Sequence, residues 1–178
     1  RYDREVFAVN YPLLLLKIEK VKLLLKREST WYSTTESTER EIKEGEALTK
    51  LIAANRLAYE NSTGFQERAY FSEVDDSPQP YFVYLPKAYY DSPTKPYPLM
   101  VFLHGYDTST TKVNAWTLSS NVLDLCDRKG YVVAIPYGRR NTDFVSIGEV
   151  DVMTVIGEMK KHFRLDPDRV YLMGVSMG

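Results

Sequence analysis

The chain of 178 residues is 44% hydrophobic and 26% charged, a composition typical of a folded domain with one sizeable core. Its 23 basic and 24 acidic residues give a formal net charge of -1, so it lacks the basic field that nucleic-acid binding requires. The longest apolar run near its N-terminus, residues 13–16, is far shorter than the roughly 20 residues that span a bilayer, and we expect no membrane span.

The first 60 residues carry two helical patterns. Apolar side chains within residues 4–27 recur at spacings of four, three and four residues and so share one face of a predicted helix, namely Leu14, Ile18, Val21 and Leu25. Pro12 is the position at which this helix would kink. Thr38 and Glu41 then have the spacing of a capping box, which predicts a second helix with Leu48, Ile52 and Tyr59 on its apolar side. We expect this helical segment to pack against the rest of the protein or against another copy of the chain, rather than to form a substrate lid.

Strand patterns begin after residue 68. Residues 69–74 and 81–85 are short β-rich runs separated by the turn-forming residues 75–78, which predicts an antiparallel strand pair. Residues 99–103 are continuously apolar, as expected of a strand buried on both faces, and this strand ends at His104 and Gly105.

Helices and strands alternate in the rest of the chain. One predicted helix has Leu118, Val122 and Leu125 on one face and stops at Gly130, and a strand follows over residues 131–135. The single cysteine, Cys126, lies in this helix and is predicted to be a small buried apolar residue rather than a nucleophile. The next helix has Val152, Ile156, Met159 and Phe163 at helical spacing, and residues 166–168 form a turn into a last strand, residues 169–173. This alternation predicts a mostly parallel sheet with functional loops at the carboxyl ends of its strands.

The sequence Gly174-Val175-Ser176-Met177-Gly178 directly follows that last strand. It has the form of a nucleophile elbow, a sharp strand-to-helix turn that exposes a serine hydroxyl. Ser176 is therefore the predicted nucleophile, and the backbone N–H of Met177 is predicted to stabilise the oxyanion of a tetrahedral intermediate. Gly174 and Gly178 are expected because side chains at these positions would collide with the neighbouring strand and helix.

The loop after residues 99–103 reads His104-Gly105-Tyr106-Asp107, and a second oxyanion donor is expected in such a loop. We assign this donor to the backbone N–H of Tyr106. His104 is interpreted as a residue that orients the loop with Gly105, not as a general base.

Other polar residues have plainer interpretations. His162 is expected to be a solvated residue at a helix C-terminus, and Glu149 and Asp151 are expected to be first-turn acids of a helix. No residues show metal-ligand spacing, and neither a metal nor a cofactor is predicted. Several tyrosines are expected in loops near the mouth of the site, namely Tyr89, Tyr90, Tyr97, Tyr106 and Tyr137.

The chain from about residue 81 to residue 178 resembles the esterase and prolyl-oligopeptidase-like branch of the α/β-hydrolases. The segments that carry the resemblance are Tyr84-Leu85-Pro86, Pro98-Leu99-Met100-Val101-Phe102-Leu103-His104-Gly105, Gly148-Glu149-Val150-Asp151-Val152 and Leu165-Asp166-Pro167-Asp168-Arg169-Val170-Tyr171-Leu172-Met173-Gly174-Val175-Ser176-Met177-Gly178. The resemblance implies acyl transfer through Ser176, with a catalytic Asp and then a His expected beyond Gly178. We accordingly expect a helical segment over residues 1–66, and the N-terminal half of an α/β-hydrolase domain, ending after the elbow, over residues 67–178.

The leading hypothesis is a carboxylic-ester hydrolase, a serine esterase acting on small-molecule or polysaccharide-linked esters such as feruloyl, acetyl or polyester-type substrates. A prolyl-oligopeptidase-like serine peptidase is the first alternative, and a non-catalytic interaction protein on the same scaffold is the second. A homo-oligomer formed through the N-terminal helices is also compatible with the sequence. Because the chain begins with Arg1, an earlier signal peptide or domain is compatible with it, and no compartment is predicted.

Overall fold

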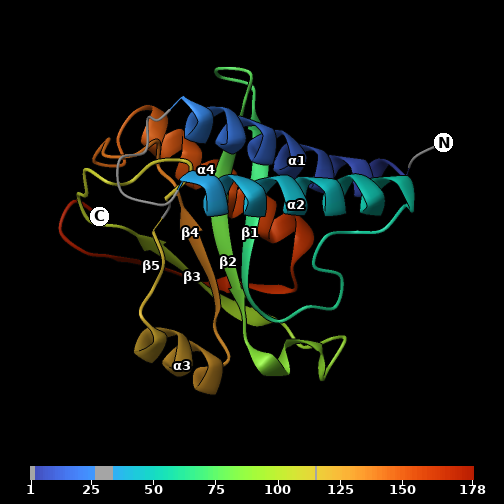
Figure 1. Cartoon of the computed structure of the whole chain (residues 1–178). Helices are drawn as coiled ribbons and strands as arrows, with labels where there is room; N and C mark the ends of the chain where they lie inside the picture. The colour runs from blue at the N-terminus through green and yellow to red at the C-terminus, as the bar shows by residue number, and fades with distance from the viewer. Residues whose placement is uncertain (1–2, 27–33, 115) are drawn as a thin grey trace. The chain divides into compact units, whose positions relative to one another are not determined.

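The computed structural model describes residues 3–26, 34–114 and 116–178 (Figure 1). In chain order the elements are α1 (Arg4–Leu25), α2 (Thr34–Ala53), β1 (Gly64–Ser72), β2 (Ser77–Leu85), the short 3-10 helix η1 (Lys87–Tyr90), β3 (Tyr97–Leu103), α3 (Ser120–Lys129), β4 (Val132–Pro136), α4 (Ile147–His162) and β5 (Leu165–Gly174). The chain forms two compact units, one of residues 1–60 and 69–80 and the other of residues 61–68 and 81–178. Among the described residues, no helix combines the length and the apolar character needed to cross a membrane.

The strands form a mixed sheet in the order β1-β2-β4-β3-β5. β2 pairs antiparallel with β4, whereas β3 pairs parallel with both β4 and β5. β1 and β2 are neighbours joined by a turn over residues 73–76, in which Asp76 has a φ of 48°. The predicted α/β fold, with an antiparallel strand pair before a parallel sheet, is therefore confirmed. Because β3, β4 and β5 are parallel, the loops that follow them start from one edge of the sheet.

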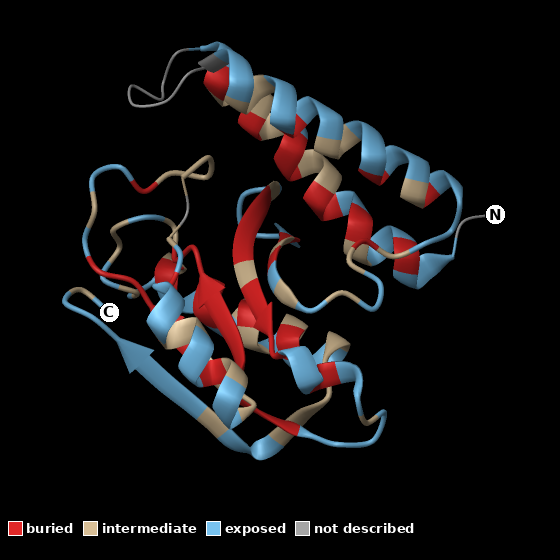
Figure 2. Ribbon diagram, turned by 60° about the horizontal axis from the view of Figure 1, so that its bottom comes forward, coloured by how far each residue is buried: buried red, intermediate tan, exposed pale blue. Residues whose placement is uncertain are grey.

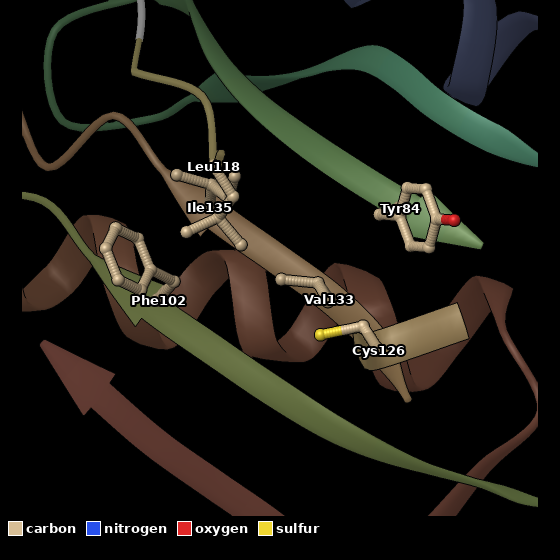
Figure 3. Close-up of a cluster of buried hydrophobic side chains, with 6 residues drawn as sticks. All are labelled: Tyr84, Phe102, Leu118, Cys126, Val133 and Ile135. Atoms are coloured by element: carbon tan, nitrogen blue, oxygen red, sulfur yellow. The ribbon is translucent and has the colours of Figure 1, made fainter. Parts of the chain in front are cut away.

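One cluster of the core of the second unit lies between the sheet and α3 (Figure 3). Its buried side chains come from β2, β3, β4, α3 and the segment before α3, and they are Tyr84, Phe102, Leu118, Cys126, Val133 and Ile135. Cys126 is only 5% exposed, which confirms its prediction as a buried apolar residue. The predicted face of α3 is partly wrong, because Leu118 precedes the helix and Leu125 is exposed. The helix does end at Gly130, whose left-handed conformation suits glycine.

β5 is largely exposed, in contrast to β3 and β4, as Figure 2 shows. The predicted turn over residues 166–168 lies inside β5, where it interrupts the pairing with β3 instead of preceding the strand. Tyr97 is paired with Leu165, but Leu99 is already paired with Val170. The extra residues of β5 bulge out of the ladder. Beyond the bulge the register is regular as far as Leu103 opposite Gly174.

α1 and α2 build the first unit. Its core cluster consists of Leu13, Leu16, Leu48, Ala58 and Ala69. Of the apolar stripe predicted on α1, Ile18 and Leu25 are exposed and Leu14 and Val21 are half-buried, so its packing against another copy of the chain stays a prediction. The buried face of α1 instead combines Leu13, Leu16 and Leu24 with two buried lysines, Lys17 and Lys20.

The predicted capping box is also wrong. α2 begins at Thr34, so Thr38 and Glu41 lie inside the helix. Glu41 is 3% exposed and one of its carboxylate oxygens lies 2.9 Å from the Nζ atom of Lys17. Lys17 also contacts the carboxylate of Glu44. Glu41 therefore serves as a buried partner for a cation of α1 rather than as a cap for the first turn of α2.

Candidate active site

The chain turns sharply after β5. The N–H of Gly178 donates a hydrogen bond of 3.1 Å to the carbonyl of Val175, and Ser176 between them has a φ of 55°. A left-handed backbone at a residue other than glycine costs about 1–3 kcal/mol and persists only where the surrounding structure enforces it. Here the N–H of Val175 also donates a hydrogen bond of 3.2 Å to the carbonyl of Leu103, at the end of β3.

Both glycines of this turn are in close contact with backbone. A Cβ atom at Gly174 would overlap the main chain of Gly178, and a Cβ atom at Gly178 would overlap the carbonyl of Leu103. Backbone atoms cannot be displaced as the end of a flexible side chain can. This packing is the steric reason for glycine at both positions and lets the turn close tightly over the end of β3.

The loop after β3 lies against the turn that carries Ser176. A Cβ atom added to Gly105 would be 3.4 Å from the carbonyl oxygen of Val175 and 3.5 Å from the Cβ atom of Ser176. Tyr106 follows Gly105 and its side chain is exposed. The structure thus brings together the predicted nucleophile and the loop that contains one predicted oxyanion donor.

His104 is buried at the base of this loop, with 1% of its surface exposed. Its Nδ1 atom lies 2.8 Å from the carbonyl oxygen of Gly105, and its Nε2 atom lies 3.0 Å from that of Tyr137. A neutral imidazole carries one N–H and donates to one of these carbonyls, whereas a protonated one donates to both. The Gly105 carbonyl belongs to the same peptide group as the N–H of Tyr106. A hydrogen bond from His104 to that carbonyl therefore orients the predicted oxyanion donor.

The imidazole is also enclosed by two aromatic rings. Trp116 is nearly parallel to it, with 5.9 Å between ring centroids and an interplanar angle of 13°, and Phe144 meets it edge-on at 5.1 Å. These rings shield His104 from solvent. Both ring nitrogens face main-chain carbonyls rather than Ser176, and this geometry agrees with an orienting role for His104.

The loop after β4 and the first part of α4 contain two candidate residues that the sequence reasoning missed. Asp151 was expected to be a simple first-turn acid of α4, but it is 1% exposed and its Oδ2 atom accepts a hydrogen bond of 2.7 Å from the N–H of Gly138. Its Oδ1 atom lies 3.7 Å from the Nε atom of Arg139. A signal for this role is present in the sequence, because Asp151 shares a helical face with Val155 and Met159 and an acid on a buried face needs a partner.

Asn141 is the second missed residue. Its Oδ1 atom accepts a hydrogen bond of 3.1 Å from the N–H of Asp107, and its Nδ2 atom donates one of 3.0 Å to the carbonyl of the same residue. Sequence spacing gives no sign of this contact, because the two residues are 34 positions apart. These two hydrogen bonds therefore hold the loop after β4 against the loop after β3.

His162 lies at the other end of α4 from Asp151, before β5 begins. It is not the solvated residue expected, since its side chain is 16% exposed and its Nε2 atom lies 3.3 Å from a carboxylate oxygen of Glu158. The hydrogen bond from His162 lowers the pKa of Glu158 below its ordinary value. His162 is therefore a partner of Glu158 in the structure.

Three of the tyrosines expected near the mouth lie at the opposite edge of the sheet. Tyr97 begins β3, and its hydroxyl donates a hydrogen bond of 2.6 Å to the carbonyl of Ala88. The hydroxyl of Tyr89 accepts a hydrogen bond of 2.8 Å from the N–H of Arg164, which directly precedes β5. Tyr90 packs edge-on against Tyr89. Only Tyr106 and Tyr137, of the tyrosines expected near the mouth, follow the carboxyl ends of strands.

Comparisons with known proteins bear on this geometry. No protein-family model matches the sequence. A bifunctional acetylxylan esterase/xylanase from Neocallimastix patriciarum is 36% identical over 85 residues, which are 46% of this chain and 12% of that protein. Among solved structures, the fluorophosphonate-binding serine hydrolase FphF of Staphylococcus aureus matches with a TM-score of 0.51 and 18% identity, over 64% of this chain and 48% of that one. A ferulic acid esterase matches with a TM-score of 0.51 and 22% identity, over 64% of this chain and 49% of that one.

The chain spans about half the length of these two solved proteins and a smaller part of the curated relative. Identities of 18% and 22% establish a shared fold and no more. The sheet order, the parallel pairing of β3 with β4 and β5, and the turn after β5 are the features in which that fold is visible here. The chain therefore has the fold of the α/β-hydrolases.

Proposed function

We propose that the protein is a serine hydrolase that cleaves carboxylic esters through an acyl-enzyme on Ser176. The observation that supports this most directly is the left-handed backbone of Ser176, in a tight turn directly after β5 and against Gly105. A strained turn of this kind presents a serine hydroxyl at the carboxyl edge of the sheet. An ester carbonyl bound over that edge would meet the hydroxyl and the backbone donors together.

In the proposed reaction, the Oγ atom of Ser176 attacks the ester carbonyl and forms a tetrahedral intermediate. The N–H groups of Tyr106 and Met177 are the proposed donors to its oxyanion, where each such donor is worth about 10²–10³ in rate. The alcohol then leaves with a proton and the acyl group stays on Ser176. Water attacks this acyl-enzyme and releases the carboxylic acid.

The proposed general base comes from another part of the protein. His104 is bonded to the main chain and His162 is paired with Glu158, so both histidines of the chain have other partners. We infer that the base and the carboxylate that orients it follow Gly178, in the order Ser, Asp, His that the family resemblance implies.

The proposed substrates are acetyl or feruloyl esters, linked to a small molecule or to a polysaccharide, with polyesters as a further candidate. The similarities to an acetylxylan esterase and to a ferulic acid esterase support this choice. A panel of p-nitrophenyl acetate, methyl ferulate, acetylated xylan and a prolyl p-nitroanilide discriminates it from the peptidase alternative. Turnover of the anilide alone would favour a peptidase, and no turnover of any member would favour a non-catalytic interaction protein.

The decisive experiment uses the full-length protein and an organophosphonate ester probe. Ser176 should be labelled, as mass spectrometry of the modified peptide would show. Ser176→Ala should abolish both labelling and p-nitrophenyl acetate turnover, whereas the control Ser120→Ala, at an exposed serine of α3, should change neither. Labelling of a different serine, or unchanged turnover by Ser176→Ala, would exclude the proposed mechanism.

Self-association through the N-terminal helices stays a separate proposal. The exposed side chains of Ile18 and Ile42 line a groove of about 450 Å³ within the first unit. Exposed apolar surface of this kind favours association. If the groove joins two copies, Ile18→Ser should lower the molar mass measured by light scattering after gel filtration, and Lys43→Ser, at an exposed position of α2, should not. An unchanged mass for Ile18→Ser would refute an interface at this groove.

A further inference from the structure

The loops after β3 and β4 are joined by one amide side chain. Asn141 accepts a hydrogen bond of 3.1 Å from the N–H of Asp107 and donates one of 3.0 Å to its carbonyl. Asn141 therefore binds both main-chain polar groups of Asp107, and the carbonyl also accepts a hydrogen bond of 3.1 Å from the N–H of Thr110. This is a restraint on the backbone of the loop rather than on a side chain.

We propose that Asn141 is a positioning residue for the oxyanion donor of Tyr106, an inference that rests on the proposed function. The N–H of Tyr106 belongs to the peptide group whose carbonyl, that of Gly105, lies 2.8 Å from Nδ1 of His104. The next peptide group supplies the N–H of Asp107, which Asn141 binds. The donor is thus held between His104 on one side and Asn141 on the other.

Placement of this donor has to be accurate. A catalytic group must lie within about 0.5 Å of its productive position, and a displacement of about 1 Å lowers the reaction rate roughly 100-fold. A free loop of small and polar residues would sample displacements of this size. Asn141 removes that freedom at the residue directly after Tyr106.

Asn141 is itself held in a strained loop. Gly138, Arg139 and Arg140 before it all have left-handed backbones, with φ values of 60°, 58° and 72°. Such conformations persist where tertiary contacts enforce them, and they are concentrated at functional sites. Here the buried carboxylate of Asp151 accepts from the N–H of Gly138 at 2.7 Å, and Nε of Arg140 donates to the carbonyl of Thr110 at 3.0 Å. The strained segment therefore presents the amide of Asn141 at a fixed place.

Other bonds keep the loop after β3 folded when Asn141 is changed. The carboxylate of Asp107 accepts hydrogen bonds from the N–H of Ser109 at 2.8 Å and from its hydroxyl at 2.7 Å. These local bonds close the turn without fixing the peptide group between Tyr106 and Asp107. Loss of the Asn141 amide should consequently affect the alignment of the donor more than the stability of the fold.

The test compares Asn141→Ala, Asn141→Asp and the control Asn121→Ala, at an exposed position of α3, in the full-length protein. Steady-state turnover of p-nitrophenyl acetate gives kcat and KM, and titration with the phosphonate probe counts the folded active sites. Asn141→Ala should lower kcat per active site about 10- to 100-fold with KM changed less than about threefold, because an oxyanion contact acts in the transition state. Asn141→Asp keeps an oxygen for the N–H of Asp107 and should recover part of kcat. Asn121→Ala should match the wild type.

Three outcomes would overturn the positioning role. They are a kcat per active site within about twofold of wild type for Asn141→Ala, a loss fully explained by fewer active sites, and equal losses for Asn141→Ala and Asn141→Asp. Ser176→Ala separates this failure from failure of the proposed function. If Ser176→Ala is inactive and Asn141→Ala is not impaired, the serine mechanism stands and the role of Asn141 is refuted. If Ser176→Ala retains full turnover, the proposed function itself is refuted.

Discussion

The N–H of Val175 donates a hydrogen bond of 3.2 Å to the carbonyl of Leu103, one residue past the point where Leu103 and Gly174 are paired in the sheet. The ladder between β3 and β5 thus continues into the turn that carries Ser176. Since His104 directly follows Leu103, the same contact fixes the spacing between the two loops of the candidate site. The position of Ser176 is therefore determined by strand pairing, not by the turn alone.

Gly178→Ala should destabilise the protein by about 2–3 kcal/mol, because the added methyl group would overlap the carbonyl of Leu103 and force backbone apart. Urea denaturation of the full-length protein measures this change. Gly157→Ala is the matched control, since no atom lies within 4 Å of a Cβ atom there and alanine is the better helix former by about 0.5–1 kcal/mol. Equal stability of Gly178→Ala and the wild type would contradict the packing described for the turn.

The sheet and the edge that bears the site were predictable from the sequence. Residues 99–103 form one strand pattern and residues 169–173 another, with two helical patterns and a strand between them, and this order alone predicts parallel strands with a common carboxyl edge. β3 and β5 are indeed parallel, and Gly105 contacts Ser176. A short motif at the end of such a strand is informative because functional loops lie at the carboxyl ends of parallel strands.

The first unit and the loop after β4 were not predictable in the same way. Periodicity finds apolar faces, but the buried face of α1 includes Lys17 and Lys20, whose burial depends on the carboxylate of Glu41 in another helix. The contact of Asn141 with Asp107 is likewise made to main-chain atoms, which every residue has. The order of side-chain types along the sequence therefore does not indicate the partner of such a hydrogen bond.

Lys17→Met should lower the free energy of unfolding by about 2–4 kcal/mol, because it removes the cation 2.9 Å from the buried carboxylate of Glu41 and leaves the more distant cations of Arg40 at 3.6 Å and Lys20 at 3.9 Å. Replacement of both residues, as in Lys17→Met with Glu41→Leu, should cost less than the sum of the two single changes, because each single change already removes the contact of 2.9 Å between them. Chemical denaturation of all three variants forms a double-mutant cycle. Additive effects would show that the two charges do not depend on one another, and Lys43→Met, at an exposed position of α2, serves as the neutral control.

Lowering the pH should reduce the stability of the fold, in part because Glu158 becomes protonated. The hydrogen bond from His162 lowers the pKa of Glu158, with Lys161 as a smaller cause. A carboxyl group with a depressed pKa stabilises the fold at pH values above its ordinary pKa of 4.5, and this contribution is lost as the pH falls through the lowered value. His162→Ala should therefore raise the pKa of Glu158, as NMR titration of its side-chain carboxyl carbon would show. A pKa that stays depressed in this variant would assign the shift to another group.

Asp151→Asn should destabilise the protein by about 1–3 kcal/mol although the two side chains have nearly the same shape. The carboxylate is 1% exposed, accepts a hydrogen bond from the N–H of Gly138 at 2.7 Å, and has the guanidinium of Arg139 at 3.7 Å. An amide can still accept from Gly138, but it carries no charge to balance the neighbouring cation, and a hydrogen bond to a charged acceptor is worth about 1.5–3 kcal/mol.

Glu149→Gln is the matched control for Asp151→Asn, because Glu149 is an exposed acid of the same helix and its replacement should change stability by less than about 0.5 kcal/mol. Urea denaturation compares the two variants at neutral pH, and hydrogen exchange of the Gly138 amide reports on the bond itself. Faster exchange at Gly138 in Asp151→Asn alone is the expected result, because the neutral acceptor holds that N–H less tightly. Equal stability and equal exchange in the two variants would mean that the loop after β4 keeps its left-handed backbone without the charge of Asp151.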